Sequence, residues 1–416
     1  MKTELLKRSV PMKADLSDIQ SYGREALIRR EIPHRRMEAW RFTDINRLKL
    51  LTSHKNLSSE KSRLQVSELI LPEVAQGTYR ILLTDKIDPL ATFYLPDGIE
   101  QLTSEEIKNN LGKTLSATGC QYHWPVELNY ANASYCLALK IKGNNNKLEI
   151  VHAPTHQGIQ AIRVLLILEE DSNLDLTQIN LGQGLQLSSL TLEVYLKRGS
   201  NLIHGLLAFA ENEAGFLDHT SVVQEAHSHY TFTSVLRGWA LGRIEPRITQ
   251  IHGKARTVLR GLQIVEGNNQ IDTHSYISFE GPEGELDQLH KSLADNKGHS
   301  IFNGIIRVPC LAQLTNASQL SRNLLLSAQA RIDTKPELEI VADDVRCTHG
   351  ATISQMQEDE VFYLQSRGLD YKQASNLVKK GYYQDILDSL PESSNAWTPL
   401  ERVMQSDSPL LNLHKP

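Results

Sequence analysis

The stretch LEEDSNL, Leu168–Leu174, decides the fold, because it returns as LKRGSNL at Leu196–Leu202. Both copies fit the pattern L-x-x-x-S-N-L, and each lies between runs rich in Val, Ile, Leu, Thr and Tyr. A strand, a short charged turn with Ser-Asn and another strand therefore follow one another twice. This is a weak repeat at a spacing typical of repeat proteins.

The same alternation of strand-length segments and Gly/Asn/Asp turns extends from about Val126 to Val345, with few stretches of helical periodicity. A sandwich, a propeller or a β-solenoid is compatible with so many short strands. The weak repeats and the inconsistent hairpin signals favour a solenoid of stacked rungs over the other two. We therefore expect a mainly β fold with its core over residues 121–348.

Helical patterns flank this core. Residues 15–31 have apolar side chains near helical spacing around Gly23, a weak point for a helix. Residues 358–368 (EDEVFYLQSRG) form a second such pattern, which ends in a glycine suited to a left-handed C-cap. Asp370 and Gln373 then form a capping-box pair that starts a third helix.

A solenoid needs its open ends covered against edge pairing, so helical flanks are physically reasonable. We divide the chain into a helical or mixed region over 1–120, the β core over 121–348 and a C-terminal helical region over 349–416.

Composition excludes several classes of protein. The 416 residues carry a formal net charge of −5, which argues against a nucleic-acid-binding protein. The longest apolar run, about Val164 to Leu168, is far too short for a membrane span, and the N-terminus lacks the apolar core of a signal peptide. No CxxC pair occurs among Cys120, Cys136, Cys310 and Cys347, so we expect a cytoplasmic protein in which the first three are free thiols.

Two glycine motifs fail as nucleotide sites. Gly112 begins a GKT, but the residue five positions earlier is Ile107, so the Gly-rich phosphate loop is missing. The GQG beginning at Gly182 has Leu187 where a dinucleotide fingerprint has its third glycine. We expect no nucleotide on this chain.

Two pairs of side chains are candidate metal ligands. His227 and His229 would share a strand face, but no third ligand follows from spacing, so a solvent-facing pair is favoured. In DDVRCTHGAT (343–352), Cys347 and His349 are also two residues apart, and Gly350 is expected to end their strand.

Three interpretations of Cys347 and His349 are open. Val345 would share their face, which favours Cys347 as a small buried apolar residue. A Cys–His hydrolase would need an oxyanion site and a partner for its base, and nothing nearby in the sequence supplies them. A metal or iron–sulfur site would need further ligands, and these would have to come from another polypeptide. The packing role and the shared site are about equally supported by the residues alone.

The C-terminal segments resemble the SufB/SufD family of iron–sulfur cluster assembly proteins. The similarity covers most of the chain, is strongest from about Gly298 to Leu387 and is weak over residues 50–120. The N-terminal motif PHRRMEAWRFTD (33–44) resembles the SufD branch in particular. The motifs are PHRRMEAWRFTD (33–44), GHSIFNGIIRV (298–308), the segment 312–345, RCTHGATISQ (346–355) and EDEVFYLQSRGL (358–369).

This resemblance implies a right-handed parallel β-helix with helical flanks. It implies a non-catalytic scaffold that forms a heterodimer with SufB and docks the SufC ATPase, with ATP bound by SufC; a homodimer is possible when SufB is absent. By the same resemblance, His349 and Cys347 would hold a transient iron–sulfur cluster shared with SufB. The SufC docking region would include Glu360, Phe362, Tyr363, Arg367 and Gly368.

Two other classes of function are left open. A β-helix protein acting on polysaccharide would present paired carboxylates and aromatic platforms, but aromatic residues are only 6% of this chain and its acidic pairs fall mainly in turns. A purely structural subunit would use Cys347 and His349 for packing alone.

Overall fold

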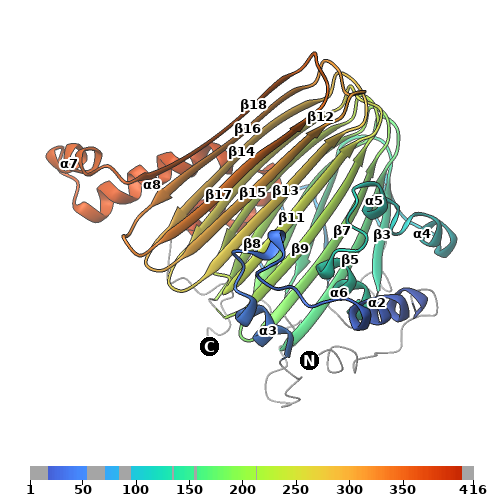
Figure 1. The fold of residues 1–416 in the computed structure, drawn as a ribbon, viewed down its shortest axis with the longest axis horizontal. Coiled ribbons are helices and arrows are strands. Elements are labelled where there is room, and N and C mark those ends of the chain that lie inside the picture. The colour runs from blue at the N-terminus through green and yellow to red at the C-terminus, as the bar shows by residue number, and fades with distance from the viewer. Residues whose placement is uncertain are drawn as a thin grey trace.

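The computed structural model describes residues 17–53, 71–83, 95–133, 135–153, 157–211 and 213–404. Within these ranges, two sheets of nine strands each stack into a parallel β-solenoid of about eight turns (Figure 1). The expected mainly β solenoid with flanking helices is thereby confirmed.

The first sheet is parallel throughout and places the even-numbered strands side by side after β1. Its strands in spatial order are β1 (Tyr79–Leu83), β4 (Asn146–His152), β6 (Asn173–Gly182), β8 (Asn201–Ala210), β10 (His229–Arg237), β12 (Arg256–Val265), β14 (Glu285–Ala294), β16 (Asn316–Leu325) and β18 (Arg346–Gln355).

The second sheet holds the odd-numbered strands and is parallel except at one end, where β2 (Ile99–Gln101) pairs antiparallel with β3. From that end the strands are β3 (Cys136–Ile141), β5 (Gly158–Leu168), β7 (Gln186–Leu196), β9 (Gly215–Gln224), β11 (Leu241–Gln250), β13 (Gln270–Phe279), β15 (His299–Val308) and β17 (Arg331–Ile340).

The two copies of the sequence repeat lie on successive rungs, with equivalent leucines as register partners. Leu168 pairs with Leu196 between β5 and β7, and Leu174 pairs with Leu202 between β6 and β8. The turn between them needs one left-handed residue, which is Asp171 at φ 55° in one copy and Gly199 at φ 71° in the next. Asp and Gly are among the residues that tolerate this conformation, so the repeat encodes both the strands and the corner.

Leu, Ile and Val side chains from both sheets fill the solenoid and form its main core. The apolar part of the interior is therefore a packed core.

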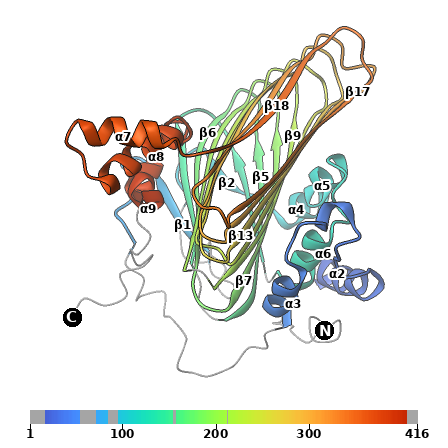
Figure 2. The same cartoon turned by 60° about the vertical axis from the view of Figure 1, so that its left-hand side comes forward.

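The N-terminal helices cover the outer face of the second sheet (Figures 1 and 2). Gly23 lies within the first of them, where an added Cβ would come 2.6 Å from the backbone nitrogen of Ala131. The glycine therefore permits close helix contact. The elements are α2 (Ser17–Arg29), η1 (Glu38–Trp40), α3 (Ile45–Ser53), α4 (Ser104–Asn110), α5 (Lys113–Ala117) and α6 (Trp124–Asn132).

The C-terminal helices pack on the outer face of the first sheet, with α7 extending away from it (Figure 2). Trp397 anchors this region by donating from Nε1 to Oε2 of Glu149 on β4 at 2.8 Å. The capping box of Asp370 and Gln373 is confirmed, and Gly368 has the left-handed φ of 96° expected after a helix end. The elements are α7 (Glu358–Ser366), α8 (Tyr371–Leu387), η4 (Glu392–Trp397) and α9 (Pro399–Met404).

The expected strand end at Gly350 is wrong. Strand β18 continues to Gln355, with Gly350 in register with Leu320 on β16. A strand paired along its whole length to a neighbour tolerates one interior glycine, because the ladder hydrogen bonds do not depend on a side chain.

The solenoid strands thus extend to Gln355, and helix α6 lies inside the range 121–348. Residues 1–16, 54–70 and 84–94 of the expected N-terminal region, and residues 405–416 at the other end, lie outside the described residues. None of the helices described is long and apolar enough to cross a membrane.

Candidate functional site

The last rung of the solenoid exposes one edge of each sheet. Strands β17 and β18 are the terminal strands in the sheet order, and each pairs within its sheet on one side only, with β15 and β16. Large apolar side chains are exposed around this end, and an open edge with apolar side chains indicates an interaction surface. We call it the open rung and define it by the exposed side chains of Leu311, Leu314, Ile340, Val341 and Ile353.

Cys347 and His349 lie on the inward face of the open rung. They are in register with Ala317 and Gln319 of β16, whose side chains are buried in the solenoid. Cys347 is half-buried and packs on the main core together with Val345. Burial raises the pKa of the Cys347 thiol, which favours the protonated form, while a hydrogen bond with the Ala317 backbone acts in the opposite direction.

His349, by contrast, is exposed because no further rung covers it. Below it, Gln319 donates from Nε2 to Oε1 of Gln288 at 2.8 Å, and its own buried Oε1 has no hydrogen-bond partner within the described part of the chain. Gln288, Gln319 and His349 thus lie on successive rungs, and the unsatisfied acceptor, Oε1 of Gln319, is next to the rung of His349. Cys347 and His349 share a face, as their spacing predicts, but differ in exposure.

Helix α7 carries the residues expected to dock a partner. Phe362 and Tyr363 are 70% and 57% exposed. Arg367 places its guanidinium 5.4 Å from the centre of the Tyr363 ring, and Glu360 is exposed in the first turn of the helix. Six strand residues, 350–355, separate His349 from the approach to this helix, so the two groups of predicted residues form two separate sites.

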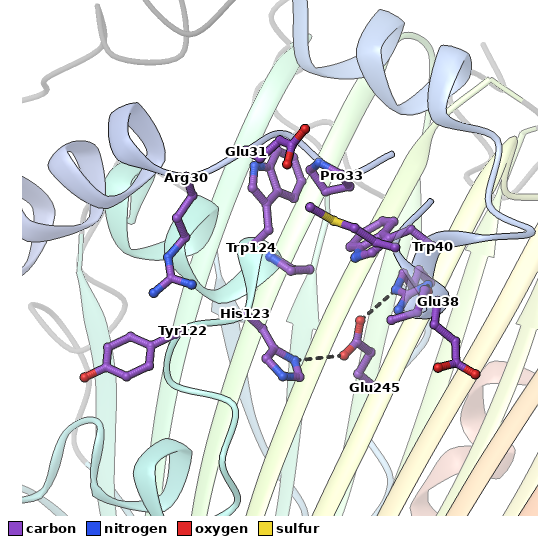
Figure 3. A pocket seen from close by; sticks show the side chains of 13 residues that line it. Arg30, Glu31, Pro33, Glu38, Trp40, Tyr122, His123, Trp124 and Glu245 are labelled. Atoms are coloured by element: carbon purple, nitrogen blue, oxygen red, sulfur yellow. Dashed lines mark hydrogen bonds and ion pairs between the residues drawn. The ribbon is translucent and has the colours of Figure 1, made fainter. Parts of the chain in front are cut away.

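A third cluster lies between the N-terminal helices and the second sheet. His219 on β9 and Glu245 on β11 are register partners. His123 reaches them from the segment before α6, and its ring lies beside the Glu245 carboxylate (Figure 3). Oε2 of Glu245 lies 3.3 Å from Nδ1 of His123 and 3.6 Å from Nδ1 of His219. The sequence analysis missed this cluster, because only the rung register brings the three residues together.

Charges around the cluster are strongly coupled. Burial would raise the pKa of Glu245, but the Arg243 guanidinium and the two imidazoles beside it hold that pKa well below its ordinary value. Burial lowers the pKa of His219 to about 3, so its ring is neutral at physiological pH. A pocket of about 380 Å³ opens beside His123, and Trp40, Trp124 and Tyr122 are among its walls (Figure 3).

The other candidate pair remains at the surface. His227 lies in a turn with φ 62°, His229 begins β10, and both are exposed with Ser228 buried between them. They do not share a strand face, because His227 precedes the strand. All four cysteines are free thiols.

The chain is similar to proteins of one family. Residues 151–382 match the family model described as "SUF system FeS cluster assembly, SufBD core domain". An iron–sulfur cluster assembly SufBD family protein of Synechocystis sp. is 31% identical over 392 residues, covering 87% of this chain and 85% of that protein.

Two further relatives are more distant. The chloroplastic protein ABCI7 of Arabidopsis thaliana is 27% identical, covering 93% of this chain and 85% of its own length. The iron–sulfur cluster assembly protein SufD of Escherichia coli is 28% identical over 228 residues, which cover 55% of this chain and 54% of that protein.

Proposed function

The chain belongs to the SufBD core family of the SUF system for iron–sulfur cluster assembly, and from this premise we propose that it is a non-catalytic scaffold subunit of the SUF complex. It would pair with SufB through the open rung and dock the SufC ATPase through α7. A nascent iron–sulfur cluster would form at the junction with SufB, and no nucleotide would bind to this chain.

The open rung is the observation that carries the proposal. It combines two unpaired strand edges with exposed apolar side chains, Val341 at 68% exposure among them. Such an edge pairs readily with another strand, and natural proteins cover it unless it serves binding. A partner that ends in a similar β-rung would continue both sheets.

Within that junction, His349 is the better candidate ligand for the nascent cluster. It is exposed on the rung that would meet SufB, whereas Cys347 is half-buried and its raised pKa disfavours the thiolate that binds iron. An imidazole in place of a thiolate suits a cluster that must be built and then released, because thiolates are the usual permanent ligands. Cys347 would support the site or ligate after the junction rearranges.

Helix α7 has features that support docking of the SufC ATPase. Its exposed aromatic pair, flanked by Glu360 and Arg367, has the composition of a protein-binding anchor. ATP-driven dimerisation of two SufC subunits would pull on α7, which joins β18 directly, and so reach the junction with SufB. Iron and sulfur would then enter the opened junction as substrates.

Co-expression with SufB and SufC tests the proposal. The wild-type chain should co-purify with both, and the complex should contain iron and acid-labile sulfide. His349→Ala should preserve the complex but lower its iron and sulfide content severalfold. Thr348→Ala, an exposed neighbour on the opposite face of β18, is the matched control and should leave both unchanged.

A purely structural subunit is the second candidate, because Cys347 packs on the core beside Val345. In that case, substituting Cys347 and His349 would weaken assembly without changing the cluster content of the complex that still forms. Failure of SufB and SufC to bind the wild-type chain would refute both candidates. Isolated chain should be monomeric or a homodimer through the open rung.

A further inference from the structure

His219 differs from the other buried histidines of the solenoid. His152, His204 and His290 each make at least one hydrogen bond through a ring nitrogen. His219 is 1% exposed, and neither Nδ1 nor Nε2 has a hydrogen-bond partner among the described residues. Buried polar atoms in native proteins are nearly always paired, so this ring calls for a partner of another kind.

The neighbouring groups are spaced as metal ligands. One nitrogen of His123, one of His219 and one oxygen of Glu245 all lie within 4.8 Å of one another. Donors around a tetrahedral zinc ion with bonds of about 2.0–2.1 Å lie roughly 3.3 Å apart. The separations of 3.3 and 3.6 Å from Glu245 Oε2 to the two Nδ1 atoms match that spacing, and the second is too long for a hydrogen bond.

Glu245 is held in the orientation that a ligand needs. Arg243 donates from Nε to Oε1 of Glu245 at 2.7 Å, which leaves Oε2 facing the imidazoles. Arg243 is itself fixed by Asp272 at 2.8 Å, so one neighbouring carboxylate balances its charge. Hydrogen bonds of this kind orient ligating carboxylates in metalloproteins.

Three ligands leave a coordination position free. His123 lies at the wall of the 380 Å³ pocket, and its side chain is 36% exposed, so it has room to close on an ion (Figure 3). Three protein ligands beside an open position are typical of reactive metal sites and not of closed structural ones. Two imidazoles and a carboxylate suit Zn²⁺ and Fe²⁺.

We propose that His123, His219 and Glu245 bind one divalent first-row transition-metal ion, Zn²⁺ or Fe²⁺, with an open coordination position toward the pocket. This site lies on the outer face of the second sheet and is distinct from the open rung, so it does not depend on the proposed scaffold function.

Titration of the full-length, chelator-stripped protein tests the proposal. Zn²⁺ measured by calorimetry should bind at one ion per chain, and Fe²⁺ under anaerobic conditions should compete for it. Co²⁺ should give the visible bands of a low-coordinate nitrogen and oxygen site without thiolate charge-transfer bands. Circular dichroism and thermal unfolding of each variant check that it folds.

The variants separate this site from other histidines and thiols. His123→Ala, at a partly exposed position, should weaken Zn²⁺ binding at least about tenfold, and Glu245→Gln should do the same. His227→Ala, an exposed histidine in a turn, and Cys310→Ala, at an exposed thiol, should bind as the wild type does. The proposal is overturned if the wild type binds no ion, or if folded His123→Ala and Glu245→Gln bind it unchanged.

Discussion

Lys291 on β14 and Asp385 on α8 form an ion pair, with Nζ 2.8 and 2.9 Å from the two carboxylate oxygens. Lys291 is almost fully buried and also donates to the backbone oxygen of Tyr382, so the C-terminal half of α8 is fixed to the first sheet. Helix α7 contacts α8 but has no comparable attachment to the sheets in the contacts described. Helix α7 is therefore attached to the sheets mainly through α8 and through its connection to β18.

The first prediction concerns helix α7. Phe362→Ala should weaken binding of the SufC ATPase by about 10- to 100-fold, the range expected for an aromatic anchor. Stability should change by less than about 0.5 kcal/mol, because the side chain is exposed. Calorimetry or pull-down with SufC measures the first effect and thermal unfolding the second. Leu50→Ala, another exposed apolar side chain on α3, is the control.

The open rung gives a reciprocal prediction. Val341→Glu should abolish or strongly weaken pairing with SufB, because a carboxylate placed in an apolar junction loses its hydration. Binding of SufC should persist. Phe362→Glu should show the opposite pattern, losing SufC and retaining SufB. If both variants lose both partners, the assignment of two separate surfaces is wrong.

Thiol labelling reports on the same surface. Cys310 is exposed and should react first with a maleimide. Cys347 should react at least about tenfold more slowly, because burial limits access and raises its thiol pKa. Cys120 should stay unlabelled until the protein unfolds, since burial raises its pKa to about 11. Mass spectrometry of timed samples gives the order, and equal rates at Cys310 and Cys347 would contradict the described rung. Bound SufB should protect Cys347.

Asp218 makes the stability of the chain depend on pH. Burial raises the pKa of this carboxyl from 3.8 to about 7, although Thr220 donates a hydrogen bond to it at 3.0 Å. The folded protein therefore keeps a proton that the unfolded chain loses above about pH 4. This contribution to stability is present at low pH and is lost as the pH rises from about 4 to about 7.

Asp218→Asn removes this pH-dependent contribution to stability, because an amide does not titrate. The free energy of unfolding of Asp218→Asn relative to wild type should increase over this range, by at most about 1.4 kcal/mol per pH unit. Urea denaturation at several pH values measures it. The neutral histidines of the core contribute equally to both proteins and cancel.

The fold could be predicted because the repeat is local. Leucines 28 residues apart, at 168 and 196, mark the same position on successive rungs, and the structure pairs them directly. The prediction from Gly350 was wrong, because glycine is common at strand ends. Here the pairing of β18 with β16 continues past this residue. Local residue preference loses there to the sheet ladder.

The candidate sites differ in how far sequence alone leads. Cys347 and His349 are visible as a motif, and their role at a cluster stays a prediction. His219 and Glu245 are invisible without the register, because the spacing of paired residues varies along the chain. It is 28 residues from Asn173 to Asn201 but 31 from Glu285 to Asn316.

The antiparallel strand β2 has a consequence for assembly. In the second sheet, another copy stacking head to tail would bring its β17 against β2, which runs against the direction of every other strand there. Open heterologous contacts tend to produce fibres, but only the 3 residues of β2 could pair with the 10 of β17, and very short edge strands disfavour such addition. The short strand β2 thus disfavours head-to-tail addition of further copies through the second sheet.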